Sequence, residues 1–431
     1  MIYIIPVSNG FSFAFFFDIS IYFCYNDFDF LKEGGHMISK KMENMVKNGS
    51  AIRAMFEEGK KMAEKYGAEN VYDFSLGNPS VEPPTEVKKA IAEVIENYKP
   101  NYVHGYMLNP GYEEVRGKIA ENINKRFGTN FAVRNIVMTV GAAGGMNVIM
   151  KSLLNPGDEV VVFSPYFGEY RSYASNFDAK IVEISPDTSS FQPKLDEFEA
   201  KLTANTRIVI VNSPNNPTGV VYSEATIKNI AAILEKKQAE FGAPIYILSD
   251  EPYRELAFDG VEVPYITKYY KNTIVGYSFS KSLSLPGDRI GYLVIPDEAD
   301  DSENIISAAG VATRILGFVN APSLAQLFVS KCLDAKVDVE IYNRNRELLY
   351  NALLEYGYEC VKPEGAFYLF VKALEADDKA FVAKAKEHRL LIVPGSTFGC
   401  AGYVRIAYCV DYDMIKRALP EFKKLAEEYK R

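Results

Sequence analysis

Hydrophobic and polar positions follow two alternating patterns through the middle of the chain. Short runs of β-branched and aromatic residues, typical of buried strands, alternate with stretches in which apolar residues recur every three or four positions. One such stretch begins at Ser223, a residue type that favours a helix start, and continues to residue 234. This alternation predicts a mostly parallel sheet flanked by helices. The predicted strands are residues 159–163, 179–184, 207–212, 244–249, 273–278 and 289–295.

The regions on either side of this pattern predict a second, smaller unit. Residues 52–66 and a repeat that begins at Val87 both have helical spacing. Beyond residue 320 we expect a long helical stretch from Ser323 to Tyr356, and then strand, helix and strand at 365–371, 378–388 and 402–410. The predicted fold class is therefore α/β, with a large domain built on the parallel sheet and a smaller α+β C-terminal domain. The expected division is an N-terminal arm with part of the small domain (37–82), the large domain (83–315) and the small domain (316–431).

Residues 1–36 differ from the rest of the chain. They are rich in Phe and Tyr and lack the positive start and small-residue cleavage site of a secretory signal. Asn9, Gly10 and Asp18 interrupt the run, so it does not predict a membrane helix. The codons of Lys32-Glu33-Gly34 can contain a ribosome-binding sequence shortly before Met37. We therefore expect these residues to be an extension, translated as a leader ahead of a start at Met37.

Composition narrows the possible functions mainly by exclusion. The chain has 431 residues, with 48 Lys and Arg against 56 Asp and Glu, a net charge of −8. This balance argues against nucleic acid as a partner, because phosphate binding needs concentrated positive charge. Five cysteines without a C-x-x-C pair, and only three histidines, predict neither a disulfide framework nor a metal site. We expect a cytoplasmic protein with no membrane partner.

Four polar motifs each follow an apolar run, at the predicted carboxyl ends of strands, where open parallel sheets bind ligands. Each motif also has a purely structural explanation. A glycine-rich helix start can bind phosphate or only allow close packing, Asn-Pro-Thr-Gly forms turns, Asp250 could cap a helix, and Lys281 could be a solvated lysine. Together, however, an Asp, an Asn, a Tyr, a Lys and a phosphate cup match the needs of pyridoxal phosphate. The motifs are Gly141–Gly145, Asn212–Gly219, Ser249–Tyr253 and Ser278–Lys281.

From about Met37 to the C-terminus, the chain resembles the fold type I, class I and II aminotransferases. The most specific motif is Ser278-x-x-Lys281, followed eight positions later by Arg289. The order and spacing of Asn-Pro-Thr-Gly and of Asp250-x-x-Tyr253 also match. Two further matches are Tyr106-x₄-Gly-x₃-Val-Arg, with Val where Leu is usual, and the segment from Gly395 to Ile406.

The resemblance implies pyridoxal phosphate as cofactor and assigns a role to each matching residue. Lys281 would bond to the cofactor aldehyde and move protons, and Asp250 would keep the pyridine nitrogen protonated. Asn216 and Tyr253 would hydrogen-bond the ring oxygen. Phe167 would stack on the ring, or it packs in the core. The phosphate would be held by Ser278, Arg289 and the backbone of Ala142 and Ala143.

The resemblance also implies how substrates and subunits are arranged. Arg405 would bind the substrate α-carboxylate, together with Asn216 and the backbone of Gly77. Tyr106 would reach the phosphate of a neighbouring subunit, so a homodimer with shared sites is expected. Arg314 of one subunit would bind the side-chain carboxylate of a substrate in the other subunit's site, or it pairs with a surface acid. The predicted reaction is transfer of an amino group from an L-amino acid, with aspartate as the best candidate, to 2-oxoglutarate.

Two alternatives use the same fold. A carbon–sulfur β-lyase would need the same Lys281 and Asp250, and no motif separates it from an aminotransferase. A regulator with an aminotransferase-like domain would need a basic DNA-binding module, for which the 36-residue extension is too short and, being acidic, has the wrong charge.

Overall fold

The computed structural model describes residues 38–47 and 51–430. The chain forms two compact units, residues 1–49 and residues 50–431. In the first unit the described element is α1 (Lys40–Lys47), and every other element belongs to the second. The predicted extension, residues 1–36, lies outside the described residues.

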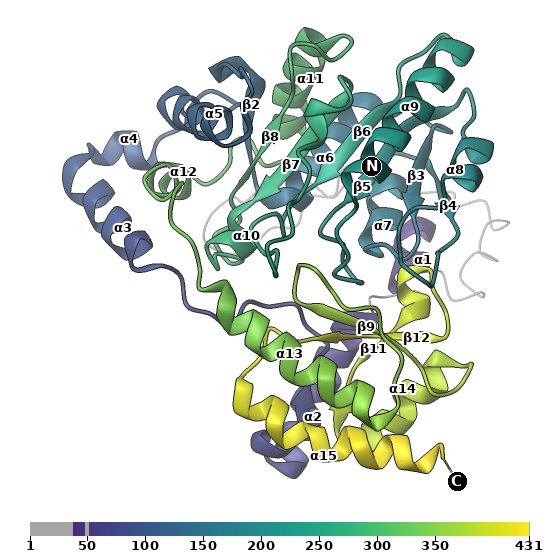
Figure 1. The fold of residues 1–431 in the computed structure, drawn as a ribbon. Coiled ribbons are helices and arrows are strands. Elements are labelled where there is room, and N and C mark those ends of the chain that lie inside the picture. The colour runs from purple at the N-terminus through teal and green to yellow at the C-terminus, as the bar shows by residue number, and fades with distance from the viewer. Residues whose placement is uncertain (1–37, 48–50, 431) are drawn as a thin grey trace, which may run out of the picture. The chain divides into compact units, whose positions relative to one another are not determined.

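The larger part of the second unit is built on a seven-stranded sheet (Figure 1). Five neighbouring strands run parallel, whereas β8 is antiparallel to both of its neighbours. Nearly every residue of the central strands is buried, as expected for strands covered on both faces. The α/β fold with a mostly parallel sheet is therefore confirmed. In spatial order the strands are β2 (Ile136–Thr139), β8 (Gly291–Val294), β7 (Thr273–Ser278), β6 (Tyr246–Asp250), β5 (Thr206–Asn212), β3 (Glu159–Phe163) and β4 (Lys180–Ile184).

Helices cover both faces of this sheet because successive strand residues point in opposite directions. Val160 and Val162 pack in one core with α6 (Gly141–Leu153) and α11 (Ser302–Ile315), whereas Val161 packs in another with α9 (Glu224–Phe241). Ser223 caps α9 as predicted, accepting a hydrogen bond from the Thr226 N–H. The remaining helices of this part are α3 (Thr85–Asn97), α4 (Pro100–His104), α5 (Glu113–Phe127), α7 (Glu169–Ser175), α8 (Leu195–Lys201), α10 (Phe279–Ser282) and α12 (Ser323–Val329).

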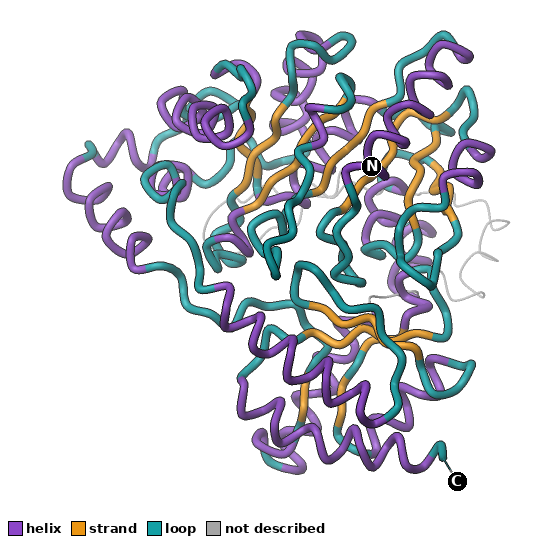
Figure 2. The backbone as a smooth tube through the Cα atoms, viewed as in Figure 1, coloured by secondary structure: helices purple, strands orange, loops and turns teal. Residues whose placement is uncertain are grey.

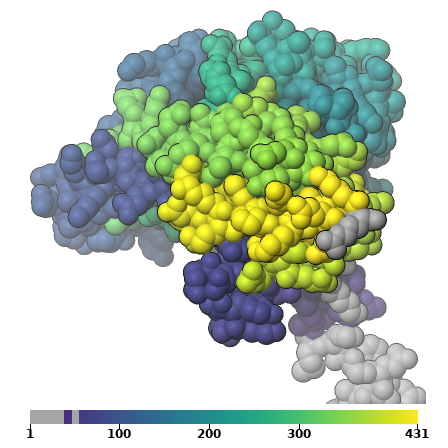
Figure 3. All heavy atoms as spheres, turned by 60° about the horizontal axis from the view of Figure 1, so that its bottom comes forward, coloured from purple at the N-terminus to yellow at the C-terminus, as the bar shows by residue number. Residues whose placement is uncertain are grey.

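The C-terminal part has its own three-stranded sheet (Figure 2). The residues around it form a separate hydrophobic core. β12 (Tyr403–Ala407) lies between β9 (Tyr368–Lys372) and β11 (Val393–Pro394), antiparallel to both. The N-terminal strand β1 (Tyr72–Asp73) pairs with β10 (Leu390–Leu391), so residues from both ends of this unit share one core. Figure 3 shows the last helix in yellow on the surface of this part. The helices here are α2 (Ala51–Tyr66), α13 (Val339–Tyr356), α14 (Asp378–Glu387) and α15 (Tyr412–Glu428).

The helical stretch predicted over 323–356 is interrupted, because the structure has two helices separated by residues 330–338. The two helices pack in different hydrophobic cores: α12 packs with α3 and α4, and α13 packs with α15. The Asp338 side chain starts the second helix by accepting a hydrogen bond from the Glu340 N–H at 3.1 Å. The helical period continues across the break, but the packing partner changes there.

None of the helices in the described part of the chain is both long and apolar enough to cross a bilayer.

Candidate active site

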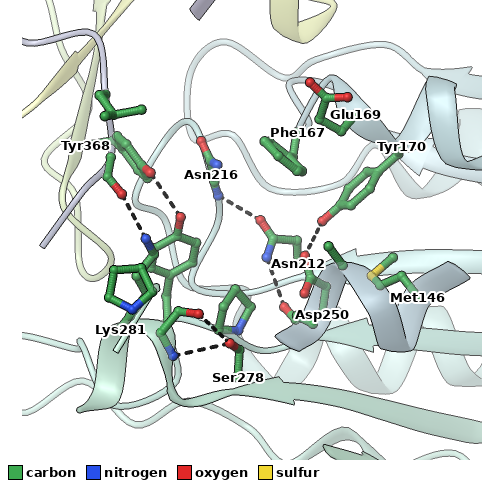
Figure 4. Close-up of a pocket in the computed structure, with 18 of the residues that line it drawn as sticks. Met146, Phe167, Glu169, Tyr170, Asn212, Asn216, Asp250, Ser278, Lys281 and Tyr368 are labelled. Carbon is green, nitrogen blue, oxygen red and sulfur yellow. Dashed lines mark hydrogen bonds between the residues drawn. The ribbon is translucent and has the colours of Figure 1, made fainter. Parts of the chain in front are cut away.

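The ends of three neighbouring strands meet at a cavity of about 640 Å³. Strand register aligns Asn212 with Asp250, and Asp250 with Gly276, so the residues that follow β5, β6 and β7 lie next to one another. Figure 4 shows the side chains that gather there. Eleven of the predicted site residues line this cavity: Gly77, Ala142, Ala143, Phe167, Asn216, Asp250, Tyr253, Ser278, Lys281, Arg289 and Arg405.

Lys281 is placed at the cavity by the short helix α10, which directly follows β7. Its Nζ donates a hydrogen bond to the Gly77 carbonyl at 2.8 Å. Withdrawal of the amine from water lowers the pKa of Lys281 to about 8; the buried Cys409 opposes this shift, and Arg289 and Arg405 add to it. About a tenth of this amine is therefore neutral, and nucleophilic, at pH 7, far more than for a solvated lysine.

Asp250 ends β6 with its carboxyl group buried in the cavity wall. Burial raises the pKa of Asp250 to about 7, a hydrogen bond from Tyr170 acts in the opposite direction, and the neighbouring Glu251 adds to the rise. Asn212 donates to the Asp250 main-chain carbonyl at 2.9 Å and fixes the strand end. Oδ1 of Asp250 is buried and has no hydrogen-bond partner among the described residues.

Arg405, on β12, brings a positive charge from the C-terminal sheet to the cavity. It donates to Asn216 Oδ1 at 3.0 Å and to the Ser75 carbonyl at 2.6 Å, and its Nε has no partner among the described residues. The rings of Tyr368 and Phe398 lie 4.5 and 4.8 Å from the guanidinium carbon. These contacts hold a buried guanidinium in one orientation, as recognition of a planar carboxylate requires.

Tyr253 and Tyr368 form a pair of buried hydroxyl groups 2.9 Å apart. The sequence motifs indicated Tyr253 but gave no indication of Tyr368, which also lines the cavity. A Cβ atom at Gly77 would lie 1.9 Å from the Tyr368 hydroxyl, so only glycine allows this close approach.

The other end of the cavity is a cup suited to an anion. Ala142 and Ala143 lie in the first turn of α6, whose N-terminal backbone N–H groups carry partial positive charge. Arg289 lies beside them, held by a hydrogen bond to the Pro286 carbonyl at 2.9 Å. A Cβ atom at Gly141 would come within 2.7 Å of the Arg289 guanidinium, so this glycine keeps the cup open.

Serine hydroxyl groups complete the cup. Ser278 and Ser280 both line the cavity, and their hydroxyl oxygens lie 2.8 Å apart. Ser280 was not predicted, although it lies between the two motif residues Ser278 and Lys281.

Phe167 lies at the cavity with its ring edge-to-face against Tyr170, the centroids 5.6 Å apart (Figure 4). It also packs against the core beneath α6, so both explanations given for this residue fit its position. Tyr170 itself was not predicted. Its position could have indicated it, because Tyr170 lies three residues after Phe167 in the same segment that follows β3.

Two predicted site residues lie away from this cavity. Tyr106 follows α4 and is 93% exposed, and Arg314 is an exposed residue in the last turn of α11. Arg314 forms no ion pair with any other residue that the structure describes. Both were predicted to act on a neighbouring subunit's site, and both roles stay predictions.

The cavity fits pyridoxal phosphate by the chemistry of its donor groups. A lysine with a lowered pKa suits the aldehyde, a cup of helix N–H groups, hydroxyls and a guanidinium suits the phosphate, and an unpartnered carboxylate oxygen suits a protonated pyridine nitrogen.

Comparison with known proteins gives one consistent family. The sequence model described as "Aminotransferase class I and II" matches residues 69–422. An aspartate aminotransferase of Pyrococcus horikoshii is 31% identical over 88% of this chain and 95% of its own length. Aromatic-amino-acid aminotransferase 2 of Thermococcus litoralis is 30% identical over 89% and 97%. The crystal structure of an aminotransferase from Eubacterium rectale is 48% identical, covers 92% of this chain and 100% of its own, and superimposes with a TM-score of 0.90.

Proposed function

The chain belongs to the class I and II aminotransferases, which are pyridoxal-phosphate-dependent enzymes, and we propose that it transfers the amino group of aspartate to 2-oxoglutarate. One observation carries the proposal: a lysine with a lowered pKa, a buried aspartate and a buried arginine line the same cavity. The reaction would follow a ping-pong sequence: the amino acid reacts in this cavity first, and the oxo acid reacts there after the first product has left.

The cofactor would be held by residues from both ends of the cavity. Arg289, Ser278 and the N–H groups of Ala142 and Ala143 would bind its phosphate, and Asp250 its pyridine nitrogen. Asn216 and Tyr253 would donate hydrogen bonds to the ring oxygen, and Phe167 would cover one face of the ring. When bound, pyridoxal phosphate supplies an electron sink for the Cα–H bond of an attached amino acid.

The chain's own groups would carry out the proton transfers and orient the substrate. Lys281 Nζ, once released by the incoming amine, would remove the proton from Cα as general base and deliver it to C4′ of the cofactor as general acid. Arg405 would hold the α-carboxylate in a bidentate contact and so orient that Cα–H bond toward the lysine. Asp250 would remain anionic beside the pyridine nitrogen and keep it protonated.

A substrate with two carboxylates needs one more cation than the cavity itself supplies. Among the described residues that line the cavity, the basic ones are Lys281, Arg289 and Arg405, and each already has a task. A distal carboxylate would therefore need a cation from elsewhere, and we assign it to Arg314 of a second subunit. Aspartate aminotransferases among the relatives support this choice, although one relative is named for aromatic amino acids. The enzyme would act as a homodimer in the cytoplasm.

Single-turnover spectroscopy tests the reaction. The cofactor-loaded protein is mixed with a panel of amino acids, and conversion of the bound cofactor to its pyridoxamine form is recorded, followed by recovery on adding 2-oxoglutarate. Stoichiometric, reversible conversion with aspartate fastest is the expected result. Release of ammonia and pyruvate from cysteine-type substrates would instead identify a β-lyase, and a preference for alanine or phenylalanine would contradict the aspartate assignment alone.

The Arg314→Leu variant tests the distal contact. Removal of one partner from a desolvated charge pair typically costs about 2–5 kcal/mol, so kcat/KM for aspartate should fall by about 30-fold or more while that for alanine is retained. Arg417→Leu, at an exposed arginine of α15, is the matched control and should leave both values unchanged. An equal loss for aspartate and alanine would show that Arg314 has no part in side-chain recognition.

A further inference from the structure

A buried tyrosine contacts the carboxylate at the centre of the site. Tyr170, on α7, is 1% exposed, and its hydroxyl donates a hydrogen bond to Asp250 Oδ2 at 2.5 Å (Figure 4). Hydrogen bonds from an O–H group to a carboxylate are short and stronger than those between neutral groups. The two residues are 80 positions apart in the sequence.

This contact leaves the two carboxylate oxygens of Asp250 in different environments. Oδ2 is occupied by Tyr170, whereas Oδ1 is buried without a partner among the described residues. A buried anionic oxygen without a partner is costly, so a ligand that donates a hydrogen bond to Oδ1 gains by binding there.

Tyr170 has little freedom to move away. Its ring lies parallel to that of Tyr166, with centroids 6.3 Å apart, and edge-to-face against Phe167. It belongs to the core that α6 and α11 form on the sheet. Burial raises the pKa of Tyr170 well above its usual value, so its hydroxyl stays protonated and remains a donor.

Resting on the function proposed above, we propose that Tyr170 is a positioning residue: its hydroxyl keeps Asp250 ionised and turns Oδ1 toward the pyridine nitrogen. Three other groups interact electrostatically with this carboxylate: Glu251, Tyr173 and Tyr253. The structure shows none of these three donating a hydrogen bond to it. Glu251 acts against ionisation, and its Oε1 and Oε2 are taken by Ser249 and Arg254. Tyr170 is the side chain that the structure shows donating to Oδ2.

Loss of this hydroxyl should have a defined chemical effect. Without the donor, the Asp250 carboxylate becomes more basic. The proton between Asp250 and the nitrogen then moves toward the carboxylate, and the nitrogen becomes neutral. The resulting loss of electron withdrawal should slow proton removal at Cα without weakening substrate binding.

The experiment uses the Tyr170→Phe variant loaded with pyridoxal phosphate that is ¹⁵N-labelled at the pyridine nitrogen. The ¹⁵N chemical shift reports protonation of that atom directly and independently of turnover. We expect the wild type to show a protonated nitrogen and Tyr170→Phe to shift toward the neutral value, with kcat lower by about 10- to 100-fold and KM nearly unchanged.

Tyr166→Phe is the matched control, because it removes a neighbouring buried hydroxyl that donates to Glu183 instead of Asp250. It should keep the wild-type shift. If Tyr170→Phe fails to bind the cofactor, replacement of Tyr170 by 3-fluorotyrosine, which retains the donor, should preserve the protonated nitrogen and activity. An unchanged ¹⁵N shift in Tyr170→Phe, or a neutral nitrogen in the fluorotyrosine protein, would overturn the inference.

The Asp250→Asn variant separates this inference from the proposed function. If Asp250→Asn leaves the nitrogen protonated, the proposed role of Asp250 itself fails. If Asp250→Asn makes the nitrogen neutral while Tyr170→Phe does not, the proposed role stands and only the inference about Tyr170 is wrong.

Discussion

At the scale of single residues, the cavity changes the chemistry of its ionisable groups by removing them from water. Lys281 and Asp250 both lose part of the hydration of their charged forms, so the pKa of the lysine falls and that of the aspartate rises. Both shifts bring a group toward the pH range in which it can exchange a proton. Arg289 and Arg405 add to the effect on Lys281 because they raise the cost of a third positive charge.

The lowered pKa predicts how Lys281 reacts in the cofactor-free protein. A small neutral acylating reagent attacks only the unprotonated amine, so the rate at Lys281 should rise about tenfold per pH unit and level off above about pH 8. Peptide mass spectrometry after brief acylation at a series of pH values measures this rate. Lys228 is an internal control, because its exposed ion pair with Glu224 raises its pKa and its rate should still be rising at pH 10. Parallel profiles for the two lysines would contradict the prediction.

At the scale of elements, the break between α12 and α13 shows how packing overrides a continuous helical pattern. Residues 330–338 carry the chain from the core that contains Phe328 to the core that contains Tyr342. One straight helix could not place both of these side chains in their separate cores. The second helix then needs its own start, which Asp338 provides.

Asp338→Ala should therefore destabilise the protein by about 1 kcal/mol, because the first turn of α13 loses its side-chain acceptor. Urea unfolding of the cofactor-free protein, followed by circular dichroism, measures the change in the free energy of unfolding. Asp338→Asn keeps an acceptor oxygen and should retain most of the stability. Equal losses in the two variants would mean that the cap does not stabilise the helix.

At the scale of the whole molecule, large apolar side chains remain exposed near the predicted subunit contact. Tyr106, Leu108 and Ile315 are 93%, 69% and 57% exposed. Asn320 connects the two segments by donating to the Leu108 carbonyl at 2.9 Å. Large apolar side chains exposed on segments that are hydrogen-bonded to each other are typical of a surface that another chain covers.

The double variant Leu108→Asp, Ile315→Asp should be monomeric, because burial of two carboxylates in an interface is unfavourable. It should also bind pyridoxal phosphate more weakly, since Tyr106 would no longer reach a neighbouring site. Light scattering coupled to size-exclusion chromatography measures the mass, and a fluorescence titration measures cofactor affinity. Leu354→Asp, at an exposed leucine of α13, is the control and should remain dimeric. A double variant that stays dimeric would exclude this surface.

The sequence by itself determined those features that depend on residues close to one another along the chain. Strand positions follow from local runs of β-branched residues, and a helix start such as Ser223 follows from its own cap. The motif residues Asp250 and Lys281 could be found because each directly follows a strand. Their meeting in one cavity then follows from the register of a parallel sheet. The division into domains and the roles of the site residues stay predictions.

Only the tertiary structure decided the contacts between distant residues. Tyr170 reaches Asp250 across 80 positions, and Arg405 reaches the Ser75 carbonyl across 330. Tyr368 joins the site because its hydroxyl lies against Tyr253. The break at residues 330–338 likewise depends on which core each helix meets. Periodicity records which face of an element is buried, but not the partner that buries it, and these features depend on that partner.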